Sequence, residues 1–230
     1  MNYNEAMEKL KKYGQEHVLS YYDELTDEQK RVLIEQIDRT DFGVIRQAAE
    51  AAGRGRIAPI KAMTIHEIDM GRESFEHIGM EAIRSGKVGA VLLAGGMGTR
   101  LGSDAPKGMY DIGVNKHVYI FQRLIENLMR VVEKSGNYIQ LFVMTSEKNH
   151  DATVEFFKEH GYFGYDSEYV AFFKQDMAPA SDFNGKVYME AKDCIAASPN
   201  GNGGWFLSMK KSGLLELIDK RGIEWLNVFA

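Results

Sequence analysis

The sequence has almost no cysteine and no long apolar run, and each shortage excludes a class of protein. Its single cysteine, Cys194, cannot form a disulfide within the chain, and no cysteine–histidine spacing resembles a zinc site. No apolar stretch approaches the roughly 20 residues that span a bilayer. The segment Met1–Lys12 lacks the apolar core of a signal peptide. We therefore expect no membrane partner and a cytoplasmic location.

The chain also lacks an excess of positive charge. Its 28 Lys and Arg residues stand against 33 Asp and Glu residues, a formal net charge of −5. The broad basic surface of a nucleic-acid-binding protein is therefore not expected. Hydrophobic residues make up 44% and charged residues 27% of the 230 residues, which is ordinary for a globular protein with one or two domains.

The N-terminal part has the periodicity of helices. Apolar residues recur at helical spacing over residues 10–25, and Thr26 begins a capping-box pattern for a second helix. A third short helix is predicted over Phe42–Ala52, and a further helix over Glu73–Ser85. Residues 1–86 are thus predicted to form an N-terminal helical segment.

From Val88 onward the pattern changes to strands that alternate with helices. Val88–Ala94 is an almost continuous apolar run, which is typical of a parallel strand buried on both faces. Further strands are predicted over residues 139–144, 169–173 and 223–229, with shorter ones at 187–189 and 194–197. Helices are predicted from about Phe121 to Gly136, from Asn149 to His160 and from Trp205 to Lys220. Residues 87–230 are therefore predicted to form an α/β domain with a mostly parallel sheet.

A glycine-rich loop follows the first of these strands and gives the strongest chemical signal. Glycines at 95, 96 and 98 allow a ligand to approach the backbone closely, and their N–H groups can form an anion-binding nest. Arg100 and Lys107 add positive charge, which suits a triphosphate. The pattern is neither a Walker motif nor the dinucleotide fingerprint. From the loop alone, a tight strand-to-helix turn with incidental charges remains the alternative.

The whole string Leu93–Gly102, followed by Pro106-Lys107-Gly108, resembles the nucleotide-binding motif of the UDP-sugar pyrophosphorylase family. The resemblance is strongest to the eukaryotic-type UDP-N-acetylglucosamine pyrophosphorylases. Further similar segments follow in order along the chain: Pro106–Asp111, Met144–Ser146, Phe172–Ala180 and Pro199–Gly204. Their co-occurrence over nearly the whole chain is far more specific than any single motif.

The resemblance implies a Rossmann-like fold of the nucleotide-diphospho-sugar transferase type and a uridylyltransferase activity. A sugar 1-phosphate, either N-acetylhexosamine 1-phosphate or glucose 1-phosphate, would attack the α-phosphorus of UTP, and pyrophosphate would leave. Arg100 and Lys107 would neutralise phosphate charge as catalytic cations. The nucleotide-binding residues implied by the family pattern are Leu93, Ala94, Gly95, Gly96, Gly98, Thr99, Lys107, Gln175 and Gly201.

Two of the implied roles concern side-chain amides. Gln175 would recognise uracil, because an amide both donates and accepts hydrogen bonds, and Asn202 would contact the sugar. Without the resemblance, a solvated loop glutamine and a turn-forming asparagine beside glycine are the better interpretations. Asp111 belongs to a matched segment and is expected to be structural.

The chain departs from the family pattern at several positions and at its end. Met97 stands where glutamine is frequent, Asn200 replaces an aspartate, and Trp205-Phe206 replaces smaller or tyrosine-containing pairs. The aspartate ligand of Mg²⁺ is expected beyond Ala230, so no metal ligand is assigned within the chain. We therefore expect a fragment with an incomplete sheet, which is either truncated or the partner of a separate C-terminal chain. The alternative to an enzyme is a UTP-binding or partner-docking module without catalysis.

Overall fold

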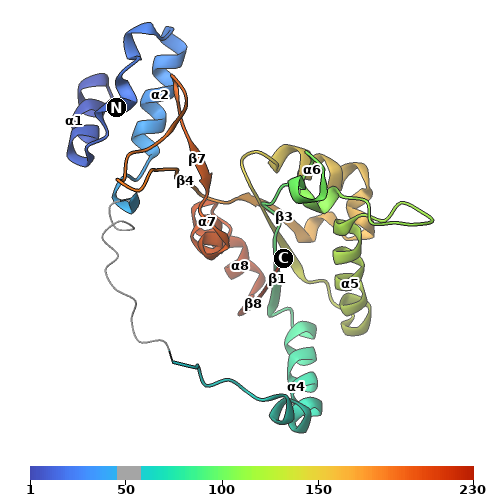
Figure 1. Ribbon diagram of the computed structural model, residues 1–230. Coiled ribbons are helices and arrows are strands. Elements are labelled where there is room, and N and C mark those ends of the chain that lie inside the picture. Colours follow the sequence, from blue (N-terminus) through green and yellow to red (C-terminus); the bar gives the residue numbers. More distant parts are fainter. Residues whose placement is uncertain (46–57) are drawn as a thin grey trace. The chain divides into compact units, whose positions relative to one another are not determined.

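The computed structural model describes residues 1–45 and 58–230, so most of the helix predicted over Phe42–Ala52 lies outside the described residues. The chain forms two compact units (Figure 1). The first contains Met1–Ile60 and Met177–Asn200, and the second contains Lys61–Asp176 and Gly201–Ala230. This division differs from the boundary after residue 86 that the sequence suggests.

Among the described helices, none combines the length and apolar character needed to cross a bilayer.

The first unit begins with two capped helices. α1 (Tyr3–Tyr13) starts at a capping box formed by Asn2 and Glu5 and ends at Gly14, which is left-handed with φ 66°. The helical spacing of apolar residues continues beyond Gly14, but the backbone there forms two short 3₁₀ turns instead. α2 (Asp27–Arg39) begins at the predicted capping box of Thr26.

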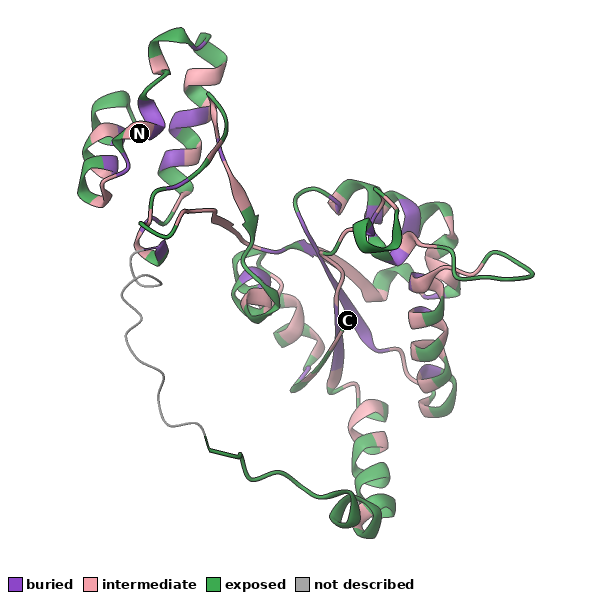
Figure 2. Ribbon diagram, viewed as in Figure 1, coloured by how far each residue is buried: buried purple, intermediate pink, exposed green. Residues whose placement is uncertain are grey.

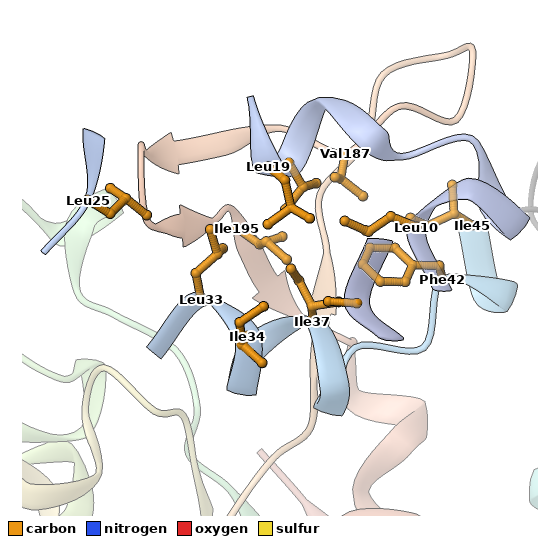
Figure 3. Close-up of a cluster of buried hydrophobic side chains, with 12 residues drawn as sticks. Leu10, Leu19, Leu25, Leu33, Ile34, Ile37, Phe42, Ile45, Val187 and Ile195 are labelled. Carbon is orange, nitrogen blue, oxygen red and sulfur yellow. The ribbon is translucent and has the colours of Figure 1, made fainter. Parts of the chain in front are cut away.

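Residues 177–200 pack with these helices as short antiparallel strands. β4 (Met177–Pro179) pairs with β7 (Ala197–Pro199), and β5 (Met189–Ala191) pairs with β6 (Cys194–Ile195). Val187 and Ile195 enter the core formed by the apolar faces of α1 and α2 (Figure 3). The buried members that Figure 3 labels are Leu10, Leu19, Leu25, Leu33, Ile34, Ile37, Phe42, Ile45, Val187 and Ile195.

Two glutamines tie this returning segment to the N-terminal residues through its backbone. Gln15 donates to the Gly185 carbonyl (2.6 Å) and accepts from the Val187 N–H (3.0 Å). Gln36 donates to the Asp193 carbonyl (3.0 Å) and accepts from the Ile195 N–H (2.9 Å). Each side-chain amide therefore pairs with a backbone carbonyl and a backbone N–H, as a peptide group of a neighbouring strand would. These bonds explain why residues 177–200 belong to the first unit.

The second unit contains a four-stranded parallel sheet in the order β3-β2-β1-β8. Its strands are β1 (Val88–Leu93), β2 (Gln140–Thr145), β3 (Val170–Lys174) and β8 (Trp225–Phe229). The helices of this unit are α4 (Ile65–Arg84), α5 (Ile120–Ser135), α6 (His150–Glu159), α7 (Trp205–Lys211) and α8 (Leu215–Arg221). The predicted α/β class with a parallel sheet is confirmed.

Alternate residues of the strands enter two separate cores, one on each face of the sheet. Leu92 and Leu141 pack with α5 and α6 residues such as Phe121 and Phe157. On the other face, Val91, Phe142 and Met144 pack with Met209 of α7 and partly buried residues of α8. All six residues of β2 are buried (Figure 2). The continuous apolar runs in the sequence reflect this burial on both faces.

Two helices of the second unit differ from their predicted bounds. α4 begins at a capping box of Thr64 and Glu67 rather than at Glu73, and none of its residues is buried. Without a buried face, its apolar periodicity gave no clear start. The helix predicted over Trp205–Lys220 is divided into α7 and α8, because Gly213 adopts a left-handed conformation with φ 74°.

Candidate functional site

The glycine-rich loop leaves the carboxyl end of β1 and doubles back on itself. Its path brings Lys107 beside Gly96, and Met97 pairs with Pro106 in an isolated antiparallel bridge. Three backbone hydrogen bonds fix this path: Ala94 N–H to the Met144 carbonyl (2.7 Å), Gly98 N–H to the Ala105 carbonyl (2.8 Å) and Lys107 N–H to the Gly96 carbonyl (3.1 Å).

Three consecutive peptide N–H groups of this loop are left without an acceptor. Within the described residues, the N–H groups of Gly95, Gly96 and Met97 donate no hydrogen bond to the protein. A β-carbon built on Gly96 would meet no heavy atom within 4 Å. Unpaired backbone donors of this kind at the carboxyl end of a parallel strand form an anion-binding surface.

Gln175 lies against this loop. It follows β3, is 7% exposed, and its backbone N–H donates to the Thr145 carbonyl (2.7 Å). A β-carbon at Gly95 would lie 2.5 Å from the side-chain nitrogen of Gln175. The residue at 95 must therefore lack a side chain if the buried amide is to keep this position. The fold brings together two residues that the sequence could connect only through a family resemblance.

Thr145 and His150 hold the ends of β2 and β3 together beside Gln175. The Thr145 hydroxyl donates to the Phe173 carbonyl (3.1 Å), so the His150 Nδ1 at 2.7 Å must be the donor in the second bond. Burial, followed by the positive charge of Lys174, lowers the pKa of His150. A neutral imidazole with its proton on Nδ1 satisfies this arrangement.

Asn149 approaches the loop from the turn between β2 and α6. Its sequence position predicts a helix cap, and it is the N-cap residue of α6, but its side chain makes no capping bond. Instead, Nδ2 donates to the carbonyls of Ala94 (3.0 Å) and Gly96 (3.4 Å). The sequence offered no signal for this contact, because an asparagine at a helix start has an ordinary local explanation.

The two expected cations lie on exposed turns of the same loop. Arg100 belongs to a 3₁₀ turn over Thr99–Leu101, and Lys107 begins another over Lys107–Met109. In the part of the chain that the structure describes, neither side chain forms an ion pair. Both charges are therefore available to an anionic ligand.

Gly108 allows the Lys107 turn to lie directly on the core. A β-carbon at Gly108 would lie 2.2 Å from the ring of Phe121, which is 1% exposed in the first turn of α5. The glycine of the Pro-Lys-Gly segment is thus required by its packing against Phe121.

Gly201 and Asn202 lie at the start of the 3₁₀ turn that leads into α7, and both are exposed. α7 is joined to the end of β3 through Ser208, which accepts from the Asp176 N–H (2.9 Å) and donates to the Gly204 carbonyl (3.1 Å). Within the described residues, no hydrogen bond links Asn202 to the loop after β1.

Asp111 closes an exposed loop that ends at Tyr119. Its carboxylate accepts from the Val118 N–H (2.9 Å), His117 Nδ1 (2.5 Å) and the Gly113 N–H (2.8 Å). These bonds, with that of Val118 the largest effect, lower the pKa of Asp111 to about 2. Its lone pairs are engaged within the loop, which supports the structural role expected for it.

No three acidic, histidine or cysteine side chains of the described residues lie together in a group that could hold a metal ion. The residues at the carboxyl end of the sheet therefore offer backbone donors, cations and amides rather than a carboxylate cage.

Comparison with known proteins identifies the family of this chain. The family described as UTP–glucose-1-phosphate uridylyltransferase matches residues 47–230. The chain belongs to this uridylyltransferase family. It is 35% identical over 244 residues to UDP-N-acetylglucosamine diphosphorylase 2 of Arabidopsis thaliana, covering 97% of this chain and 49% of that protein. It is 34% identical to UDP-N-acetylglucosamine pyrophosphorylase of Saccharomyces cerevisiae, covering 96% of this chain and 48% of that protein.

A solved structure has a similar fold. The UDP-N-acetylglucosamine pyrophosphorylase of Trypanosoma brucei matches with a TM-score of 0.75 and 28% identity, over 97% of this chain and 50% of the other. This chain thus spans about half the length of each of these relatives. Each relative is a single chain that also contains the other half, so a separate C-terminal chain as partner is not supported.

Proposed function

We propose that this chain provides the UTP-binding part of a UTP:sugar-1-phosphate uridylyltransferase, which forms a UDP-sugar and pyrophosphate. The observation that carries the proposal is the contact between Gln175 and Gly95. It places a buried amide suited to a pyrimidine base directly beside unpaired backbone donors suited to phosphates. Family membership supports the same reaction.

In this proposal the loop backbone and its cations act on the phosphates of UTP. The backbone from Leu93 to Thr99 holds the nucleotide, and Gly201 approaches it from the start of α7. Arg100 and Lys107 neutralise charge on the α-phosphate and on the leaving pyrophosphate, while the sugar phosphate attacks directly. No covalent intermediate is needed.

The sugar substrate that we propose is N-acetylhexosamine 1-phosphate, with Asn202 on the sugar side. The names of the relatives from Arabidopsis thaliana and Saccharomyces cerevisiae support this choice over glucose 1-phosphate. The resemblance also implies Mg²⁺. The described residues do not form a carboxylate set for it, so we assign the ion no ligand and no step. The single cysteine supports a reducing, cytoplasmic setting.

The proposal is tested by calorimetric titration of the chain with UTP. We expect Gln175→Ala and Lys107→Ala each to raise the Kd about tenfold or more, since each removes a hydrogen bond or charge worth about 1–3 kcal/mol. Gln122→Ala removes a glutamine whose side chain donates to Glu126 within α5 and should leave the Kd unchanged. A folded native chain that binds no UTP would contradict the proposal.

Turnover separates the enzyme from a UTP-binding module without catalysis. UDP-sugar formation should be measured with N-acetylglucosamine 1-phosphate and with glucose 1-phosphate. Product formation that is lost in Lys107→Ala supports the enzyme. UTP binding without product from either sugar phosphate, even when the C-terminal half of a matched relative is supplied, supports the binding module.

A further inference from the structure

One buried side chain, that of Asn149, donates to two carbonyls of the glycine-rich loop, and the second of these, the Gly96 carbonyl, also accepts from the Lys107 N–H (3.1 Å). We propose that Asn149 is a positioning residue for nucleotide binding, which turns the carbonyls of Ala94 and Gly96 inward and thereby presents the neighbouring N–H groups to the ligand. This inference rests on the proposed function of the loop.

The hydrogen bonds of Asn149 use all the groups of its amide. Nδ2 donates to the carbonyls of Ala94 (3.0 Å) and Gly96 (3.4 Å), and Oδ1 accepts from the Ser146 N–H (2.7 Å). The residue is fully buried, with 0% of its surface exposed. A flipped amide would place its oxygen against two carbonyl oxygens and its NH₂ group against an N–H, so only one orientation is compatible with this pocket.

The geometry of the peptide group links the two bonds from Asn149 Nδ2 to the direction in which the neighbouring backbone N–H groups point. In a trans peptide group, the carbonyl of one residue and the N–H of the next point in opposite directions. Because the carbonyls of Ala94 and Gly96 point to Asn149, the N–H groups of Gly95 and Met97 point away from it. These are two of the loop donors that have no acceptor within the described residues.

Asn149 is itself held in place by the turn after β2 and by the helix α6 that follows it. Asn149 precedes α6, whose residues Phe156 and Phe157 are buried in the core beside β2. Its own N–H donates to the Ser146 carbonyl (3.3 Å), which closes the turn after β2. A loop fixed to such a turn does not have to be ordered when the ligand binds, so less conformational entropy is lost on binding.

The experiment compares substitutions of Asn149 with a matched substitution at the opposite end of β1. Asn149→Ala removes the amide, and Asn149→Asp keeps the acceptor but replaces the donor with oxygen. Asn137→Asp is the control, because Asn137 Nδ2 also donates to two carbonyls, those of Arg84 (3.1 Å) and Ile83 (3.4 Å).

We expect both Asn149 variants to raise the Kd for UTP about tenfold or more, and Asn137→Asp to leave it unchanged even if it lowers stability. The alanine variant separates loss of the bonds from charge repulsion between an aspartate and the phosphates. In the absence of UTP, the amide NMR signals of Gly95, Gly96 and Met97 should shift in both Asn149 variants and not in Asn137→Asp. A folded Asn149→Ala chain with native affinity and native loop signals would overturn the inference.

A measurement on the native chain covers the case in which the variants do not fold. The two Nδ2 protons of Asn149 should exchange slowly with water, because both are bonded and buried. Rapid exchange of these protons would overturn the inference. The loop signals are measured without UTP, so a native chain that binds no UTP would contradict only the proposed function.

Discussion

At Gly95 the lack of a β-carbon determines where a distant side chain can lie. In Gly95→Ala the new methyl would lie 2.5 Å from Nε2 and 2.9 Å from Cδ of Gln175. The end of a flexible side chain can move aside, so the free energy of unfolding should change by no more than about 1 kcal/mol. The displaced amide, however, should lower UTP affinity by about tenfold, as measured by calorimetry.

A double-mutant cycle tests this explanation. If Gly95→Ala acts by displacing Gln175, its effect on the Kd should largely disappear in a Gln175→Ala background. Gly79→Ala, whose β-carbon would meet nothing within 4 Å on α4, serves as the control and should leave the Kd unchanged. Fully additive effects of the two site substitutions would show that Gly95 acts independently of Gln175.

At the scale of elements, the Lys107 turn and α5 meet at a contact that only glycine permits. In Gly108→Ala the methyl would lie 2.2 Å from the ring of Phe121, which is enclosed by the core and cannot move aside freely. We expect this variant to lose about 1–3 kcal/mol of unfolding free energy through overpacking, measured by urea denaturation. Phe121→Leu in the same chain should recover part of the loss. An alanine variant as stable as the native chain would contradict this contact.

At the scale of the whole molecule, the hydrogen bonds of Gln36 assign residues 177–200 to the first unit. Gln36→Leu would leave the Asp193 carbonyl and the Ile195 N–H without their partner, which costs about 1–3 kcal/mol. Hydrogen exchange should therefore become faster in residues 1–45 and 177–200. Exchange in β1 and β2 of the second unit should not change. Equal acceleration in both units, or none, would contradict this prediction.

The sequence by itself determined most elements of the second unit. The run Val88–Ala94 and the apolar stripe of α5 are local sequence patterns. A strand that is buried on both faces of a parallel sheet consists of consecutive apolar residues, so it can be recognised from the sequence. The glycine-rich loop was also visible as a local pattern, because a backbone that must stay uncovered excludes side chains along a continuous stretch. α4 was poorly placed because, with no buried residue, it has no pattern imposed by a core.

Only the tertiary structure decided which of these segments meet. The packing of residues 177–200 with α1 and α2 depends on Gln15 and Gln36, whose partners lie far along the chain. Likewise, nothing near Asn149 in the sequence indicates that its amide turns from the helix it precedes to the carbonyls of Ala94 and Gly96. Periodicity records how deeply a residue is buried, whereas the partner of a buried polar group is fixed by the folded chain as a whole.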